Sequence, residues 1–130
     1  MQNNSLEGGG IMNFDWNYIA AGAPYLTISR LGISLNSSVL SLLGNPEKIL
    51  LGFDPNTMTI GVKPYEGEQD VKTYDIGGRV KHGWVKIGCK DFISFLTQKT
   101  GMSFSPARRF TVNREQNTQI LYVNLGKKEV

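Results

Sequence analysis

Residues 25–65, YLTISRLGISLNSSVLSLLGNPEKILLGFDPNTMTIGVKPY, contain the pattern that decides the fold. Apolar and polar side chains alternate over residues 25–30 and again over 33–35, with Gly32 in the turn between them. An alternation with a period of two is typical of strands that bury one face. The start of this stretch therefore predicts two strands joined by a tight turn.

A short helix and a hairpin are predicted to follow. Residues 36–38, Asn-Ser-Ser, can accept hydrogen bonds from the free N–H groups of a first helical turn, and the next apolar residues have helical spacing: Val39, Leu40, Leu42 and Leu43. Gly44 provides a left-handed stop, and Pro46 prevents continuation. Strands over 48–53 and 58–62 then flank an Asp-Pro-Asn-Thr sequence that favours a type I turn.

The same order of elements returns in the second half of the chain. Residues 74–80 and 84–87 correspond to the first two strands, and an apolar stripe over 92–96 corresponds to the helix. Residues 109–114 and 119–125 are expected to form a second hairpin. The second half therefore resembles a diverged copy of the first in the order and spacing of its elements.

Two tandem ββαββ repeats, residues 25–65 and 73–126, are thus expected to form one pseudo-symmetric, barrel-like domain within residues 13–130. Ile33 and Val85 are 52 residues apart, and the separation grows toward the last strands because the second helix end and the loop after it are longer. One unit alone cannot cover its apolar faces, whereas two units can interlock their strands and leave few free edges. The predicted class is mainly β with short helices.

The N-terminal residues carry two open alternatives. Residues 1–12 are polar and glycine-rich and are expected to be a disordered tail or an upstream extension. Glu7–Met12 also matches the translation of a purine-rich ribosome-binding site and a start codon, so Met12 as the natural start of a bacterial or phage gene is an alternative to an ordinary tail. Residues 14–19 alternate aromatic and polar side chains, which predicts an arm that docks on the core or forms a partner surface.

Composition excludes several classes of protein. No run of about 18 to 20 apolar residues is present, so we expect no membrane span. No charged segment followed by an apolar run is present either, so we expect no secretion. A single cysteine, Cys89, excludes an internal disulfide and fits a reducing cytoplasm, which is the expected location.

Positive charge is concentrated in the second half of the chain. Residues 1–75 hold four Lys or Arg and eight Asp or Glu, whereas residues 76–130 hold ten and three. If the cations of the second repeat lie on one side, they would attract a phosphate backbone with an affinity that falls steeply as salt rises. The predicted nucleic-acid-binding residues are Arg79, Lys81, Lys86, Lys90, Arg108, Arg109 and Arg114, and the predicted partner is double-stranded DNA.

The sequence does not predict an enzyme. The only histidine and the only cysteine, His82 and Cys89, have opposite parities in a predicted strand region, and they are too few for a zinc set. Carboxylates are scattered over turns and the connector at 66–72, which gives no acid–base pair. The segment 77–83 has glycines and cations but lacks the spacing of a phosphate-binding loop. We therefore predict no catalytic, metal-binding or cofactor-binding residue.

Three segments carry a resemblance to a known family. Leu31–Asn36, Leu42–Gly44 and Ile60–Pro64 are similar to the swapped-hairpin unit of AbrB-type and MazE-type bacterial proteins, and two units in one chain resemble the MraZ arrangement. The resemblance implies a DNA-binding regulator of transcription. The arginine that usually follows the turn glycine in these units is replaced by Ile33. The layout is also similar to that of uncharacterised bacterial and phage proteins.

A second class of function stays open. A small phage or mobile-element protein could bind and modulate a host protein without enzymatic activity, because a basic surface can also meet an acidic protein. A duplex titration at two salt concentrations discriminates the two classes. A monomer and a homodimer formed through the aromatic arm are both compatible with the pattern.

Overall fold

The computed structural model describes residues 23–126. Its elements are β1 (Tyr25–Ser29), β2 (Gly32–Asn36), α2 (Ser37–Leu42), β3 (Lys48–Asp54), β4 (Thr59–Pro64), β5 (Tyr74–Asp75), β6 (Trp84–Gly88), α3 (Lys90–Thr100), β7 (Arg108–Thr111), β8 (Asn113–Arg114) and β9 (Leu121–Asn124). The predicted mainly β class with short helices is confirmed. The predicted tail over 1–12, the start at Met12 and the arm over 14–19 lie outside the described residues.

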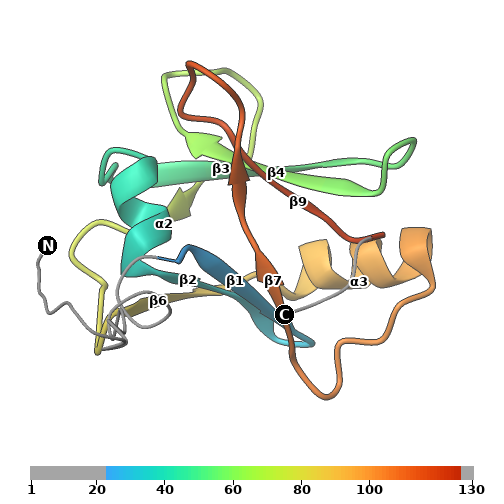
Figure 1. Ribbon diagram of the computed structural model, residues 1–130. Coiled ribbons are helices and arrows are strands. Elements are labelled where there is room, and N and C mark those ends of the chain that lie inside the picture. The colour runs from blue at the N-terminus through green and yellow to red at the C-terminus, as the bar shows by residue number, and fades with distance from the viewer. Residues whose placement is uncertain (1–22, 127–130) are drawn as a thin grey trace, which may run out of the picture.

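The strands form two antiparallel sheets. The first sheet has the order β6-β2-β1-β7, and the second has the order β5-β3-β4-β9-β8. Figure 1 shows the two sheets one above the other, with α2 at one end of the layers and α3 at the other. Each sheet directs one face toward the space between the sheets, and the helices cover the ends of that space.

The predicted order of elements in residues 25–65 is confirmed, but Met58 has a φ of 55° and belongs to the turn, so the second hairpin strand starts at Thr59. β1 and β2 pair with Leu26 opposite Leu35. The side chain of Asn36 accepts a hydrogen bond from the Val39 N–H at 3.2 Å and so caps α2. Gly44 has a φ of 83°, the left-handed conformation that ends a helix. β3 and β4 then pair from Ile49 to Asp54 across the predicted turn.

One continuous segment joins the two sheets. β7 pairs with β1 in the first sheet, whereas β8 pairs with β9 in the second. Val112 lies between β7 and β8, and its N–H donates to the carbonyl oxygen of Pro24 at 3.2 Å. The predicted second hairpin is therefore wrong in extent, because only Asn113 and Arg114 pair with β9. Figure 1 shows this orange-to-red segment rising from the lower sheet to the upper one.

The strand registers contain an internal two-fold relation. In the β2–β6 pair, Ile33 lies opposite Ile87 and Leu35 lies opposite Val85. A shift of 52 residues converts Ile33 into Val85 and Leu35 into Ile87, so it exchanges these two pairs with each other. In the β4–β9 pair, a shift of 61 residues in the same way exchanges the pairs Ile60–Val123 and Val62–Leu121. Strands at corresponding places in the two halves therefore pair with each other in both sheets, β2 with the edge strand β6 and β4 with β9.

The second half departs from this relation at its first strand. The predicted strand over 74–80 is wrong beyond Asp75, because β5 has two residues and the chain then turns. The N–H groups of Ile76 and Gly77 both donate to the carbonyl oxygen of Glu47, at 2.9 and 3.1 Å, and Gly78 has a φ of 69°. A positive φ interrupts the extended backbone of a strand. β5 therefore pairs with β3 and not with β6, and the described strands leave a gap between β5 and β6 where a closed barrel would need a pairing.

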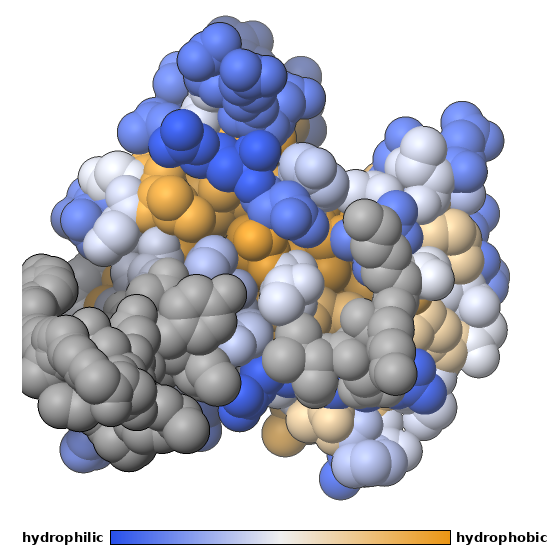
Figure 2. Space-filling view, in the orientation of Figure 1, coloured by the Kyte–Doolittle hydropathy of each residue, from blue (hydrophilic) through white to orange (hydrophobic). Residues whose placement is uncertain are grey.

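Both halves contribute to one hydrophobic core. Its fully buried members come from the facing strands of both sheets and from the two helices: Leu26, Ile28, Ile33, Leu35, Leu43, Ile49, Ile60, Leu96 and Leu121, with Val39, Val62 and Val85. The view in Figure 2 shows apolar residues in the band between the sheets and hydrophilic residues over the loops above it. In α3, Ile93 and Leu96 are buried, whereas the predicted stripe residue Phe95 is 38% exposed.

Within residues 23–126, neither helix has the length and apolar character that are needed to cross a bilayer.

Candidate nucleic-acid interface

The loop between β5 and β6 ends in a tight hairpin turn. The Lys81 N–H donates to the Trp84 carbonyl oxygen at 2.7 Å, and the Trp84 N–H donates back at 3.0 Å. His82 and Gly83 between them have φ values of 53° and 82°, which is the left-handed pair of a type I′ turn. The Ser37 N–H and hydroxyl both donate to the Gly83 carbonyl oxygen, at 2.9 and 3.1 Å, so the turn is fixed to the start of α2.

A hollow lies where this loop meets β6. Its volume is about 770 Å³, and its described lining residues are Gly78, Arg79, Lys81, His82, Trp84 and Lys86. Three of these side chains are cationic, and none of the described lining residues is acidic. An aromatic ring among cations in a concave surface is suited to a ligand that has both a planar group and negative charge.

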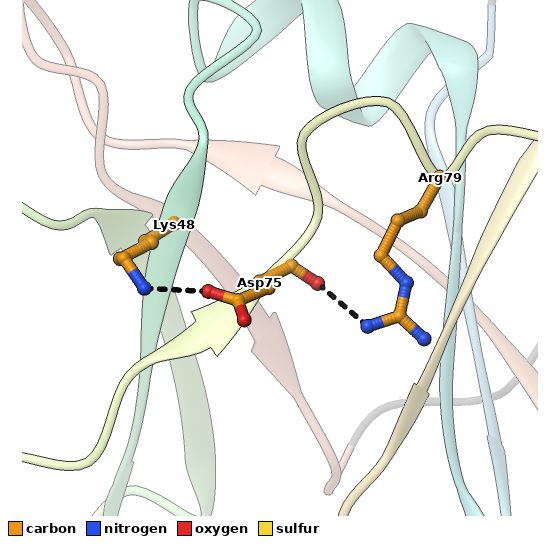
Figure 3. A network of polar contacts seen from close by, with 3 residues as sticks. All are labelled: Lys48, Asp75 and Arg79. Carbon is orange, nitrogen blue, oxygen red and sulfur yellow. Dashed lines mark hydrogen bonds and ion pairs between the residues drawn. The ribbon is translucent and has the colours of Figure 1, made fainter.

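Arg79 lies beside the hollow, and its guanidinium donates to a main-chain oxygen and not to a carboxylate oxygen. Lys48 Nζ lies 2.6 Å from Asp75 Oδ1, whereas Arg79 Nη1 donates to the main-chain oxygen of Asp75 at 3.5 Å (Figure 3). The hydrogen bond from Lys48 lowers the pKa of Asp75 and raises the pKa of Lys48. The Asp75 carboxylate is thus engaged by Lys48, and Arg79 remains able to attract an anion.

The outer face of the first sheet carries a second group of polar side chains. Successive side chains of a strand point to opposite faces, and Ile33, Leu35, Val85 and Ile87 are buried on the inner face. The outer face contains a row of residues that are paired from strand to strand: Lys86, Ser34, Thr27 and Arg109. Lys86 and Arg109 are exposed and lie on the two edge strands, β6 and β7.

An aromatic side chain also lies at the β6 edge of this face and another lies next to its β7 edge. Trp84 lies two residues before Lys86 on β6 and therefore shares its face. At the opposite edge, the Arg109 guanidinium lies over the ring of Tyr25, with Cζ 5.2 Å from the ring centroid. Both rings are half-buried. The hollow and the outer face are continuous, because Trp84 and Lys86 belong to both.

The structure brings together four of the seven predicted cations. Arg79, Lys81 and Lys86 line the hollow, and Arg109 shares the outer face with Lys86. The other three lie elsewhere: Arg108 is half-buried opposite core residue Ile28, Lys90 starts α3 beside a separate shallow hollow, and Arg114 is on β8 in the second sheet. Arg108 and Arg109 alternate across β7, so only Arg109 lies on the outer face with Lys86.

The sequence did not reveal four residues of this face, Tyr25, Thr27, Ser34 and Trp84. Each stands in a segment with clear alternation, so its parity was predictable from the sequence. Which strands lie side by side was not predictable from parity, and the strand neighbours decide that Thr27 lies opposite Arg109 and Ser34 opposite Lys86.

Nucleophilic and metal chemistry have no geometric support in the described part of the chain. Cys89 is buried, and burial raises the pKa of its thiol to about 11. His82 is exposed in the hairpin turn. Among residues 23–126, no three His, Cys, Asp or Glu side chains are grouped in a way that could hold a metal ion.

Comparisons with protein-family models, with curated proteins and with solved structures gave no match to this chain.

Proposed function

We propose that the protein binds nucleic acid through a basic surface made of Arg79, Lys81, Lys86 and Arg109. The observation that carries the proposal is the row across the first sheet, in which Lys86 and Arg109 stand at the two edges of one face. Arg79 and Lys81 extend the same surface past the β6 edge. Four cations on one side of a small domain attract a phosphate backbone more strongly than the same charges spread over its whole surface.

The dimensions of the face suit a polyanion. Three strand spacings of about 4.8 Å separate the edge strands, so Lys86 and Arg109 are about 14 Å apart across the sheet. One strand of a duplex advances about 3.4 Å per nucleotide, so the row spans about four nucleotides at that rise. The hydroxyl groups of Ser34 and Thr27 lie between the two cations and can donate to phosphate oxygens without adding charge.

The sequence resemblance supports the same class of partner. AbrB-type and MraZ-type proteins imply DNA as the ligand and control of transcription as the role, and we propose both for this chain. We also propose that its two halves arose from one such unit and form a barrel whose wall is interrupted between β5 and β6. The pairing of β2 with β6 and of β4 with β9, strands at corresponding places in the two halves, supports this descent.

A titration measures the proposed binding. Fluorescently labelled oligonucleotides, single-stranded and duplex, are titrated with the protein between 50 and 200 mM salt, and binding is followed by anisotropy. We expect the logarithm of affinity to fall linearly with the logarithm of salt concentration. In the double variant Lys86→Ala/Arg109→Ala, we expect weaker binding and a salt slope that is smaller by about 2, since each lost phosphate contact removes about 1.

The matched control removes the same charge from another part of the molecule. Lys63 is on β4 and pairs with Glu68 at 3.0 Å, and Lys99 is exposed on α3. Lys63→Ala/Lys99→Ala should leave the slope nearly unchanged. Equal losses in the two double variants would show that net charge alone governs binding and would refute the proposed surface. Absence of binding at tens of micromolar protein at the lower salt would reject nucleic acid and direct attention to an acidic protein partner.

A further inference from the structure

The basic surface is also equipped to hold unpaired bases. We infer that its ligand is a single-stranded nucleic acid whose bases stack on Trp84 and Tyr25 while its phosphates contact Lys86 and Arg109. This inference rests on the proposed function and specifies the kind of nucleic acid. The evidence for the inference is that the same arrangement, an aromatic ring beside a cation, occurs on both sides of a single sheet face.

At the β6 edge, Trp84 and Lys86 project from alternate positions of one strand toward the same side. At the β7 edge, Arg109 lies over the ring of Tyr25, which belongs to the adjacent strand β1. Aromatic rings that accept bases, in a groove whose cations follow the backbone, are the two features by which proteins bind single strands without sequence preference. The face between the two edges is polar and half-buried, with Ser34 and Thr27 on it.

The surface is concave at the Trp84 edge, where the hollow lies. A volume of about 770 Å³ lies within the range of cavities that enclose a small ligand, and Trp84 is part of its wall. Arg79 and Lys81, in the loop that leads into β6, would meet the phosphate next to a base that entered it. Bases in a duplex are stacked on one another and cannot present their faces to a side chain. The rings therefore contribute binding energy only to a strand whose bases are unpaired.

The two halves of the chain differ at these positions. The 52-residue relation places Trp84 where the first half has Gly32, and Lys86 where it has Ser34. Gly32 is buried, and a Cβ there would overlap the carbonyl oxygen of Ile87. The first half thus cannot carry a ring at its equivalent position, and the ring and the cation occur together only on β6 within this pair of equivalent strands.

The experiment uses tryptophan fluorescence together with anisotropy. The chain has two tryptophans, Trp16 and Trp84, so the variant Trp16→Phe makes Trp84 the only one. It is titrated with an oligothymidine, with a duplex of the same length and with polyglutamate. We expect the single strand to quench Trp84 fluorescence, to saturate at the concentration that anisotropy gives, and to bind more tightly than the duplex.

Two substitutions test the role of the ring directly. Trp84→Ala should weaken single-strand binding by about 5- to 150-fold, the range that corresponds to the loss of one stacked base. Trp84→Phe should retain most of the affinity. Tyr122→Ala is the matched control, because Tyr122 is an aromatic residue of the second sheet that is 38% exposed, and it should have no effect. Circular dichroism checks that each variant folds, and the quenching measurement does not depend on a Trp84 substitution.

The outcomes separate this inference from the proposed function. Equal affinity for single strand and duplex, together with unquenched Trp84, would overturn the inference and leave nucleic-acid binding in place. No binding of either oligonucleotide would remove both. Polyglutamate that binds as tightly as the oligothymidine at equal charge would also overturn both, since it would identify a surface for acidic chains in general.

Discussion

The substitution Asn36→Ala tests whether one side chain holds together the start of the fold. Asn36 Oδ1 accepts hydrogen bonds from the N–H groups of Val39 and Tyr25, both at 3.2 Å, and Nδ2 donates to the carbonyl oxygen of Ala23 at 2.9 Å. The three bonds link the end of β2 to the first turn of α2 and to the start of β1. Removal of the side chain breaks all three links at once.

The expected loss of stability follows from these bonds. Replacement of an asparagine N-cap by alanine costs about 1 kcal/mol, and each of the other two partly buried bonds contributes about 0.5 to 1.5 kcal/mol. The free energy of unfolding should therefore fall by about 2 to 4 kcal/mol. For Asn36→Asp, both acceptor bonds remain, but a carboxylate oxygen replaces the donor that faces Ala23. We expect a smaller loss, about 1 kcal/mol.

Urea unfolding followed by circular dichroism measures the effect. With an m-value of about 1.5 kcal/mol per molar urea, the midpoint of Asn36→Ala should fall by about 1.3 to 2.7 M. Asn56→Ala serves as the control, because Asn56 is exposed in the β3–β4 turn, and such surface substitutions change stability by about 0.5 kcal/mol or less. A loss in Asn36→Ala no larger than in Asn56→Ala would show that the three bonds do not add to stability, and the reasoning from their geometry would be refuted.

Two further predictions concern the β2–β6 pair and the thiol at its end. Gly32→Ala should destabilise the protein by more than about 2 kcal/mol in urea unfolding, because its Cβ would overlap the main-chain oxygen of Ile87, whereas Gly52→Ala, whose Cβ has no atom within 4 Å, should change stability little. Cys89 has a pKa of about 11 in the folded chain and about 8.5 when unfolded, so the unfolded chain loses its proton first and stability should fall as pH rises between these values. Cys89→Ala should show a flatter pH dependence of the urea midpoint over that range, and an equally steep decline would contradict the burial of the thiol.

The sequence predicted the first half well because its signals are local. The cap at Asn36, the left-handed Gly44 and the alternation of β1 and β2 act over a few residues, and the structure contains each of them. The prediction was wrong where a distant partner decides the structure. Alternation continues from β7 into β8, but the strand changes partner at Val112 from β1 to β9. Periodicity shows on which face of a sheet a residue lies, but it does not show which strand lies beside it.

The glycine pair after β5 indicated a break in the chain, but the strand prediction gave more weight to the surrounding pattern. Gly77 and Gly78 stood inside a predicted strand, although glycine in a strand interior often marks a bend or the close approach of another chain segment. Both effects occur here. Gly78 adopts a positive φ, and a Cβ on Gly77 would overlap the carboxylate of Glu47. These two glycines, which are visible in the sequence, therefore account for the loop that follows β5.

The sequence predicted only part of the candidate site, because it does not show which strands lie side by side. Charge counting located the cations in the second half, and four of them lie on one surface. It could not separate Arg109 from Arg108, whose neighbours on β1 are Thr27 and the buried Ile28. Nor could it connect Tyr25 with Arg109, since 84 positions separate them in the sequence and only the β1–β7 pairing places them in contact.

The proposed site lies where the internal two-fold relation fails, and the core explains why. Positions that face the interior are constrained by packing, so Ile33 and Leu35 correspond to the apolar Val85 and Ile87. On the outer face of the same two strands, β6 has Trp84 and Lys86 where β2 has Gly32 and Ser34. A gap between β5 and β6 can exist without exposing the core, because Ile76 remains buried on the interrupted side. The gap between β5 and β6 thus coexists with a cationic loop beside a ring and with a packed core to which both halves contribute.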